Sequence, residues 1–219
     1  MCYNVRIKYI YFLKRGYILM IIVLSGPSGC GKSTLAGLFE VKGFYRIITS
    51  TTRSRRLNDP VDQYFFVDKE DWYPEDYICK TTINGETYGI SKDYLEDLNK
   101  DLNYVVVLDE AGTKELKELF PEYVYAFYLN TLESTCRERM KMRGDADHNI
   151  DARAEYDRTH NRYNYLIKED DIYDQAFFGE DETPLLMRQI MDFFNNNPDN
   201  KDKIDEGEQI LEMLRHKKK

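Results

Sequence analysis

The amino-acid sequence predicts an α/β fold in which a mostly parallel sheet is covered by helices and carries a small mixed-β insertion. Three observations lead to this prediction. Short β-branched runs alternate with helical segments along the chain. The first run, residues 21–24, is continuously apolar, which is typical of a strand buried on both faces of a parallel sheet. Between about residues 62 and 90, short alternating runs surround an Asn-Gly pair, which indicates an antiparallel hairpin.

The elements of the first half are expected in the following order. A helix at 33–42 follows the first strand, and 46–49 is a second strand candidate. The short runs 64–67, 78–82 and 86–88 are expected to be strands of the insertion, with Asn84-Gly85 as the turn. A polar, leucine-spaced segment at 92–99 predicts a helix.

The second half begins with Tyr-Val-Val-Val-Leu at 104–108, the clearest buried strand of the chain. The next helix, at about 113–119, ends before Pro121 because proline disfavours a helical conformation in the residue before it. The remaining elements are expected as a strand at 124–129 and helices at 131–143, 150–163 and 184–194.

Three regions are interpreted along the chain. Residues 1–19 are basic and apolar and are interpreted as an N-terminal extension, with Met20 as an alternative biological start. Residues 20–195 form the folded domain, and residues 196–219 form a polar tail that ends in three lysines. The longest uncharged apolar run, residues 17–24, is far shorter than the ~20 residues of a membrane-spanning helix.

Composition favours a globular protein with an anionic ligand. The chain has 219 residues, of which 42% are hydrophobic, and a net charge of −8. An acidic protein of this kind is not expected to coat nucleic acid. Residues 1–60, however, contain ten Lys and Arg against two Asp and Glu, so an anion could bind there.

The four cysteines form no CxxC pair, and the three histidines form no HExxH-type cluster. A zinc site is therefore not expected. Reduced thiols in an intracellular, cytoplasmic protein are the simpler interpretation.

A phosphate-loop motif occupies residues 26–33, Gly-Pro-Ser-Gly-Cys-Gly-Lys-Ser, between a predicted strand and a predicted helix. This context matches GxxxxGK[ST] and predicts a parallel sheet of the P-loop NTPase type. Glycines let backbone N–H groups point at phosphate oxygens, Lys32 reaches the β and γ phosphates, and the Ser33 hydroxyl binds Mg²⁺. The expected ATP-binding residues are Gly26, Ser28, Gly29, Cys30, Gly31, Lys32, Ser33 and Thr34.

The motif alone does not distinguish kinases, GTPases and ATPases. A GTPase needs NKxD, whereas Asn99-Lys100-Asp101 has its acid one position early. Asp109-Glu110 fits a crude ATPase pattern without any further ATPase feature. A kinase must neutralise two phosphorylated substrates, and arginines at 53, 55 and 56, at 137, 139 and 143, and at 153 supply the charge.

Five segments resemble guanylate kinase in order and near-family spacing, covering about residues 20–172. They are Ser25–Leu35, Ser50-Thr-Thr-Arg-Ser-Arg-Arg56, Asp62-Gln-Tyr-Phe-Phe-Val67, Gly85-Glu-Thr-Tyr-Gly89, and Arg139-Met-Lys-Met-Arg143-Gly144 with Ile150-Asp-Ala-Arg153. The resemblance implies a parallel core, a monophosphate-binding region at about 50–90 and a lid at about 131–163. It also implies ATP as phosphoryl donor with Mg²⁺, and GMP or another nucleoside monophosphate as acceptor. Neither nucleic acid nor a membrane is an expected partner, and the oligomeric state stays open.

Residue roles follow from the same resemblance. Arg53, Arg56, Tyr64 and Tyr88 would hold the acceptor phosphate, which suits bidentate guanidinium groups and phenols. Thr49, Ser50 and Cys79 would lie near the acceptor base, and Asp109 near the metal with Ser33. The expected catalytic residues are Lys32, Arg139, Arg143 and Arg153.

The base-reading positions depart from the family. Counting back from Tyr88-Gly89, the guanine-reading Glu falls on Cys79, and the family's Ser/Thr after Tyr-Gly is Ile90. Asp109-Glu110-Ala111-Gly112 lacks the family's second acid, and Lys168-Glu169-Asp170 replaces Val-Asn-Asp. Glu75, Asp76 or Glu86 could substitute if the register slips. A kinase with a different or relaxed base preference, and a non-catalytic guanylate-kinase-like binding module, therefore remain alternatives.

Overall fold

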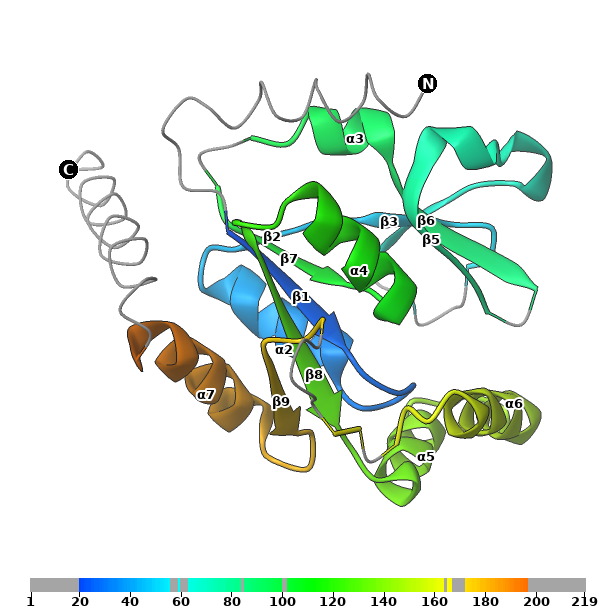
Figure 1. The fold of residues 1–219 in the computed structure, drawn as a ribbon. Coiled ribbons are helices and arrows are strands. Elements are labelled where there is room, and N and C mark those ends of the chain that lie inside the picture. Colours follow the sequence, from blue (N-terminus) through cyan, green and yellow to red (C-terminus); the bar gives the residue numbers. More distant parts are fainter. Residues whose placement is uncertain are drawn as a thin grey trace, which may run out of the picture.

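The computed structural model describes residues 20–55, 59, 63–83, 85–99, 102–163, 165–166 and 172–196. These residues form two sheets and the helices that pack on them (Figure 1). The prediction of an α/β fold with a parallel sheet and a second, mixed sheet is confirmed. In the described residues, no helix is long and apolar enough to cross a membrane.

The first sheet is entirely parallel, with strands in the order β2–β7–β1–β8–β9. Its strands are β1 (Ile21–Ser25), β2 (Tyr45–Arg46), β7 (Tyr104–Val107), β8 (Val124–Asn130) and β9 (Gln175–Phe178). The central strand β1 lies between β7 and β8, and all five of its residues are buried. The continuous apolar run at residues 21–24 is therefore explained, as the sequence indicated, by a strand that is covered on both faces.

The two faces of this sheet bury alternate residues of β1, as the two-residue period of a strand requires. Ile22 and Leu24 pack in one core with α2 (Lys32–Val41) and α7 (Thr183–Asn196). Ile21 and Val23 pack in the other core with α4 (Glu110–Leu119). Figure 1 shows α2 and α4 on opposite sides of the sheet.

The second sheet has the order β4–β3–β6–β5 and lies beside α4 (Figure 1). Its strands are β3 (Thr49–Thr51), β4 (Tyr64–Phe66), β5 (Tyr77–Ile83) and β6 (Glu86–Ser91). Strands β5 and β6 form the predicted antiparallel hairpin, while β3 and β4 are parallel. Two 3₁₀ helices, Lys69–Asp71 and Pro74–Asp76, precede β5, and α3 (Lys92–Glu96) follows β6.

Two helices, α5 (Glu133–Met142) and α6 (Asp147–Thr159), connect β8 to β9 and pack on each other. They correspond to the helices expected at 131–143 and 150–163. The second begins earlier and ends earlier than predicted. We refer to them as the α5–α6 pair.

The sequence prediction was wrong at two places in the sheets. The expected strand 46–49 is divided between β2 and β3, which belong to different sheets. The division has a local cause: the N–H of Ile47 donates to the Val105 carbonyl, and that of Ile48 to the Tyr94 hydroxyl. Strand β9 was not predicted, because only four residues pair and they do so with distant β8.

Candidate functional site

The loop between β1 and α2 folds around the Lys32 side chain. The Lys32 ammonium donates hydrogen bonds to the carbonyl oxygens of Gly26 and Pro27, at 2.8 and 2.7 Å. Helix α2 begins at Lys32, and no side chain caps its first turn. Unpaired N–H groups at a helix start, next to a lysine, make a binding site for phosphate.

Two glycines of this loop allow close approach of other elements. Gly26 has φ +142°, and a Cβ there would lie 2.6 Å from the Leu129 carbonyl oxygen of β8. Gly29 has φ +83°, and a Cβ there would lie 2.5 Å from the Cys136 carbonyl oxygen of α5. Only glycine fits such positions without displacement of the neighbouring backbone. The loop is thus packed directly between β8 and α5.

Side chains of the α5–α6 pair bind the same loop. Arg139 of α5 donates to the carbonyl oxygens of Cys30 and Gly179, at 3.0 and 2.8 Å. Asp157 of α6 is completely buried, and its Oδ2 accepts a hydrogen bond from the Ser28 N–H at 2.7 Å. Arg139 and Asp157, on helices distant from the loop in sequence, therefore supply one positive and one negative charge to it.

Asp109 lies two residues after β7 and caps α4. Its Oδ1 accepts from the Gly112 N–H at 3.0 Å, and its Oδ2 lies 3.7 Å from Nη2 of Arg162. Ser33 and Thr34, the residues after Lys32, are exposed. In the described part of the chain, no group of three His, Cys, Asp or Glu could by itself hold a metal ion. A hydroxyl and one carboxylate still suit Mg²⁺, which keeps several water ligands and needs few protein ligands.

A second cluster of charged and phenolic groups lies on β3, β4 and β6. Arg53 follows β3, and its guanidinium lies 5.3 Å from the Tyr64 ring centroid and 2.9 Å from an oxygen of Asp59. The rings of Tyr64 and Tyr88 meet edge to face, with centroids 6.0 Å apart. Three of the four expected phosphate-holding residues are thus brought together, and Arg56 lies outside the described residues.

The charge of Arg153 of α6 acts on Tyr64 of this second cluster. Burial raises the pKa of the Tyr64 hydroxyl above its usual 10.0 and Tyr88 adds to the rise, while the charges of Arg53 and Arg153 oppose it. Arg153 is four residues before Asp157, so both side chains lie on one face of α6. This face therefore carries both a residue bonded to the Lys32 loop and a residue whose charge acts on Tyr64.

Arg143, the remaining expected lid arginine, is placed differently. It is ion-paired with Asp145 two residues away, and its side chain is 48% exposed. The structure therefore brings Arg139 to the loop and places the charge of Arg153 where it acts on Tyr64, while Arg143 is paired with Asp145.

Cys79 lies in the hydrophobic core, against α4. A bulge interrupts the β5–β6 pairing here, and Cys79 has φ 51° with a side chain only 2% exposed. Its N–H donates to Oε2 of Glu115 at 2.6 Å. Burial raises the pKa of the Cys79 thiol, with smaller contributions from Glu115 and Asp109. The thiol is therefore a neutral core group.

The other residues considered for contact with the acceptor base lie around the segment that contains Cys79. Thr49 and Ser50 are buried on β3, where Ser50 pairs with Gly89 of β6, and Ile90 is buried next to it. Glu86 accepts a hydrogen bond from Thr52 and pairs with Lys69, while Glu75 and Asp76 are exposed. Glu115 is the carboxylate that bonds directly to the Cys79 backbone.

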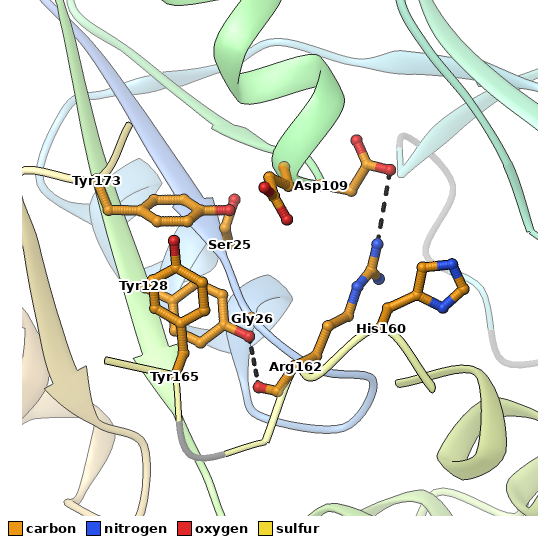
Figure 2. Close-up of a pocket in the computed structure, with 9 residues that line it drawn as sticks. Ser25, Gly26, Asp109, Tyr128, His160, Arg162, Tyr165 and Tyr173 are labelled. Atoms are coloured by element: carbon orange, nitrogen blue, oxygen red, sulfur yellow. Dashed lines mark hydrogen bonds and ion pairs between the residues drawn. The ribbon is translucent and has the colours of Figure 1, made fainter. Parts of the chain in front are cut away.

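A pocket beside the loop contains residues that the sequence did not single out (Figure 2). Ser25, Gly26 and Asp109 line it together with Arg162, which follows α6. Asp157 and Arg162 are thus the main omissions of the sequence analysis. Asp157 carried a usable signal, because its spacing of four from Arg153 places it on the same helix face. Glu115 carried none, because its partner Cys79 is 36 positions away, and the contact of Arg162 with Asp109 carried none for the same reason.

Together these groups can bind two anions. The Lys32 loop offers N–H donors, a lysine and Arg139, and the second cluster offers Arg53, two phenols and Arg153. Such positioned cations suit transfer of a phosphoryl group, for which positioning and charge stabilisation supply most of the catalysis.

Comparison with known proteins identifies relatives over most of the chain. Residues 22–161 match the family described as the AAA domain. The guanylate kinase of Anaplasma phagocytophilum is 30% identical over 172 residues, which are 72% of this chain and 82% of that protein. The guanylate kinase of Caldanaerobacter subterraneus is 32% identical over 167 residues, 70% of this chain and 81% of that protein. The crystal structure of the Anaplasma enzyme has the same fold, with a TM-score of 0.58, 22% identity, and coverage of 81% of this chain and 85% of that one.

Proposed function

Since this chain belongs to the guanylate kinase family and is an ATP-dependent nucleoside monophosphate kinase, we propose that its phosphoryl acceptor is GMP or dGMP. The reaction transfers the γ-phosphoryl group of ATP and gives GDP or dGDP and ADP. The observation that carries this proposal is the single face of α6 on which Asp157 accepts from the Ser28 N–H of the Lys32 loop and Arg153 lies near enough for its charge to oppose the rise that burial causes in the pKa of Tyr64. Residues one turn apart have Cβ atoms about 5–6 Å apart. Donor and acceptor phosphates held at these two places would therefore be neighbours.

The donor site is formed by residues 26–34. Backbone N–H groups of Gly29, Gly31 and the start of α2 bind the phosphates, and Lys32 leaves its two carbonyl partners to bind the β and γ oxygens. Arg139, already hydrogen bonded to the loop at Cys30, adds charge at the same position.

The acceptor phosphate is held by Arg53, Tyr64 and Tyr88, and by Arg56 outside the described residues. The Arg53 fork suits two phosphate oxygens, and each phenol donates one hydrogen bond. Arg153 approaches the same phosphate from α6 and neutralises the oxygen that attacks the γ-phosphorus. Because this oxygen is already anionic, little general-base catalysis is needed.

Mg²⁺ is supplied with ATP, and Ser33 and Asp109 are the residues that would hold it. The ion would neutralise charge on the β and γ phosphates as the phosphoryl group transfers. Arg143 would turn inward from Asp145 when the α5–α6 pair closes on both nucleotides. Arg143 donates two hydrogen bonds to Asp145, so phosphate oxygens would have to replace both.

A coupled assay of ADP formation tests the proposal, with ATP and each of GMP, dGMP, AMP, CMP, UMP and dTMP. We expect turnover with GMP and dGMP and none with the other four. Turnover of an adenine or pyrimidine nucleotide with equal or greater kcat/KM would contradict the guanine assignment. Failure with all six would contradict the whole proposal.

A second candidate is a kinase of the same descent with a different or relaxed base preference. The observation in its favour is Cys79, a buried neutral thiol at the position where the family resemblance places a guanine-reading carboxylate. A missing buried hydrogen-bond partner can change discrimination between substrates by about 10⁴-fold. The six-acceptor assay distinguishes the two candidates directly, because only the second predicts turnover of a base other than guanine.

A further inference from the structure

Arg162 lies between two carboxylates at the edge of the phosphate loop. Its Nη1 is 3.4 Å from Oδ1 of Asp157, and its Nη2 is 3.7 Å from Oδ2 of Asp109. Figure 2 shows the side chain extending across the pocket toward Asp109. Since Asp157 also accepts from the Ser28 N–H, contacts run from the loop through Asp157 and Arg162 to Asp109. A single carboxylate, that of Asp157, thus links the Arg162 guanidinium to the loop.

The backbone of Arg162 is held independently of its charge. Its N–H donates to the Asp157 carbonyl at 2.8 Å, and its own carbonyl accepts from the Tyr128 hydroxyl. The Tyr156 ring lies 4.9 Å from the guanidinium carbon. A side chain held at its base and along one face loses little conformational entropy when its end binds a new partner.

The contacts of the guanidinium leave some of its donors available for such a partner. Charge-assisted hydrogen bonds between nitrogen and oxygen are typically 2.7–2.9 Å long, and both contacts of Arg162 are longer. A guanidinium also has five N–H donors, more than these two contacts use. The pocket that it enters is lined by Ser25 and Gly26, the residues where β1 passes into the phosphate loop.

We propose that Arg162 binds the terminal phosphate of the nucleoside triphosphate, and that Asp157 and Asp109 hold its guanidinium in place until the nucleotide arrives. The N–H groups at the start of α2 bind the inner phosphates, and Lys32 bridges the β and γ phosphates. Ser28 lies four residues before Lys32 in the loop. The Arg162 guanidinium, between Ser28 and Asp109, would therefore meet the outer phosphate. The inference rests on the proposed function only in requiring a triphosphate in the loop, and it is independent of the acceptor base.

Calorimetric titration of the full-length chain with ATP and with ADP, each with Mg²⁺ and without acceptor, tests this role. Arg162→Gln is expected to weaken ATP binding by about 10-fold, the effect of losing one charge-assisted hydrogen bond. ADP lacks the terminal phosphate, so its dissociation constant should change by less than about twofold. Arg162→Lys should restore part of the ATP affinity, because it keeps the charge without the planar fork.

Arg158→Gln is the matched control, because Arg158 lies on α6, is 53% exposed and pairs with Glu133 and Glu155 outside the pocket. It should bind both nucleotides as the parent chain does. Equal weakening of ATP and ADP by Arg162→Gln, or no weakening of either, would overturn the proposal. Thermal unfolding of each variant shows whether any loss comes from misfolding, and a folded Arg162→Lys then decides the question.

Asp157→Asn tests separately whether Asp157 and the nucleotide compete for the Arg162 guanidinium. Asparagine still accepts from the Ser28 N–H but removes a negative charge that competes with phosphate for Arg162. ATP should therefore bind at least as tightly as in the parent chain. Tenfold weaker binding would contradict competition between Asp157 and the nucleotide. Neither binding result depends on GMP, so failure here is distinguishable from failure of the six-acceptor assay.

Discussion

Lys32 illustrates at the residue scale how a phosphate site is kept intact before its ligand binds. Its ammonium is bonded to two carbonyl oxygens of its own loop, so the loop is closed around a positive charge. Phosphate oxygens must replace those two carbonyls. Hydrogen bonds to charged groups are worth about 1.5–3 kcal/mol, and the exchange conserves them.

Lys32→Ala is expected to lower kcat by about 100- to 1,000-fold with every acceptor, since it removes a preorganised cation from the charge that develops on the transferring group. The coupled assay measures this loss. Lys42→Ala, at the exposed end of the same helix, is the control and should leave kcat unchanged. A Lys32→Ala variant with near-normal turnover would refute the role of Lys32.

The environment of Cys79 that we predicted by counting along the chain differs from its environment in the folded structure. The register count placed it at the base-reading position, but the bulge in β5 turns its thiol into the core against Gly112. A bulge and a positive φ at a non-glycine residue leave no sequence signal, because they depend on the partner strand and on Glu115. The sequence could predict the position of Cys79 along the strand, but it could not predict that the side chain points into the core.

Cys79→Ala should leave the order of preference among the six acceptors unchanged and lower the free energy of unfolding by about 1 kcal/mol, a typical loss for a small core truncation. Urea unfolding and the coupled assay measure the two effects. Ser50→Ala, on buried β3 opposite Gly89, is the comparison and should raise the KM of the preferred acceptor. A changed preference in Cys79→Ala would place the thiol at the base after all.

At the scale of elements, local signals predicted the strand, loop and helix around residues 21–41 closely. Gly26, Gly29 and Gly31 have positive φ and Lys32 begins α2, as the motif requires. Elements that depend on distant pairing were lost or misplaced, as β9 and the divided strand 46–49 were. The same limit applies to the site, where α6 supplies Asp157 through a contact 129 positions away in sequence.

Gly29→Ala tests the packing of α5 on the loop. Its Cβ would meet the Cys136 carbonyl at 2.5 Å, so α5 and Arg139 must move away. We expect a stability loss of several kcal/mol and at least 10-fold weaker ATP binding, measured by urea unfolding and calorimetry. Gly43→Ala is a matched control, because Gly43 also has positive φ (+94°) but has nothing within 4 Å of an added Cβ. Equal losses in both variants would mean that backbone strain, and not the contact with α5, is responsible.

At the scale of the whole molecule, neutral thiols and phenols are buried throughout both cores. Burial raises the pKa of the Cys136 thiol from 9.0 to about 12 and that of the Tyr173 hydroxyl from 10.0 to about 12. Burial also raises the pKa values of Cys79 and Tyr128. The unfolded chain releases these protons at lower pH than the folded chain does. Their stabilising contribution is complete below about pH 9 and is lost as the pH rises toward 12.

The free energy of unfolding should therefore fall by about 1–3 kcal/mol between pH 8 and pH 10.5, measured by urea unfolding at each pH. Cys136→Ala should show a shallower decline over this range, because it removes one of the groups that ionise only after unfolding. A parent chain whose stability is constant up to pH 10.5 would contradict the raised pKa values.

The order of the first sheet also bears on how the chain is made. Strand β1 is paired with β7 and β8, so it has neither neighbour until the ribosome has added residues up to about 107. At 5–20 residues per second, that interval is roughly 4–16 s. During this time the run Ile-Ile-Val-Leu has no sheet to join. The segment that later positions the phosphate loop is thus an exposed apolar run in the nascent chain, the kind of surface that chaperones protect.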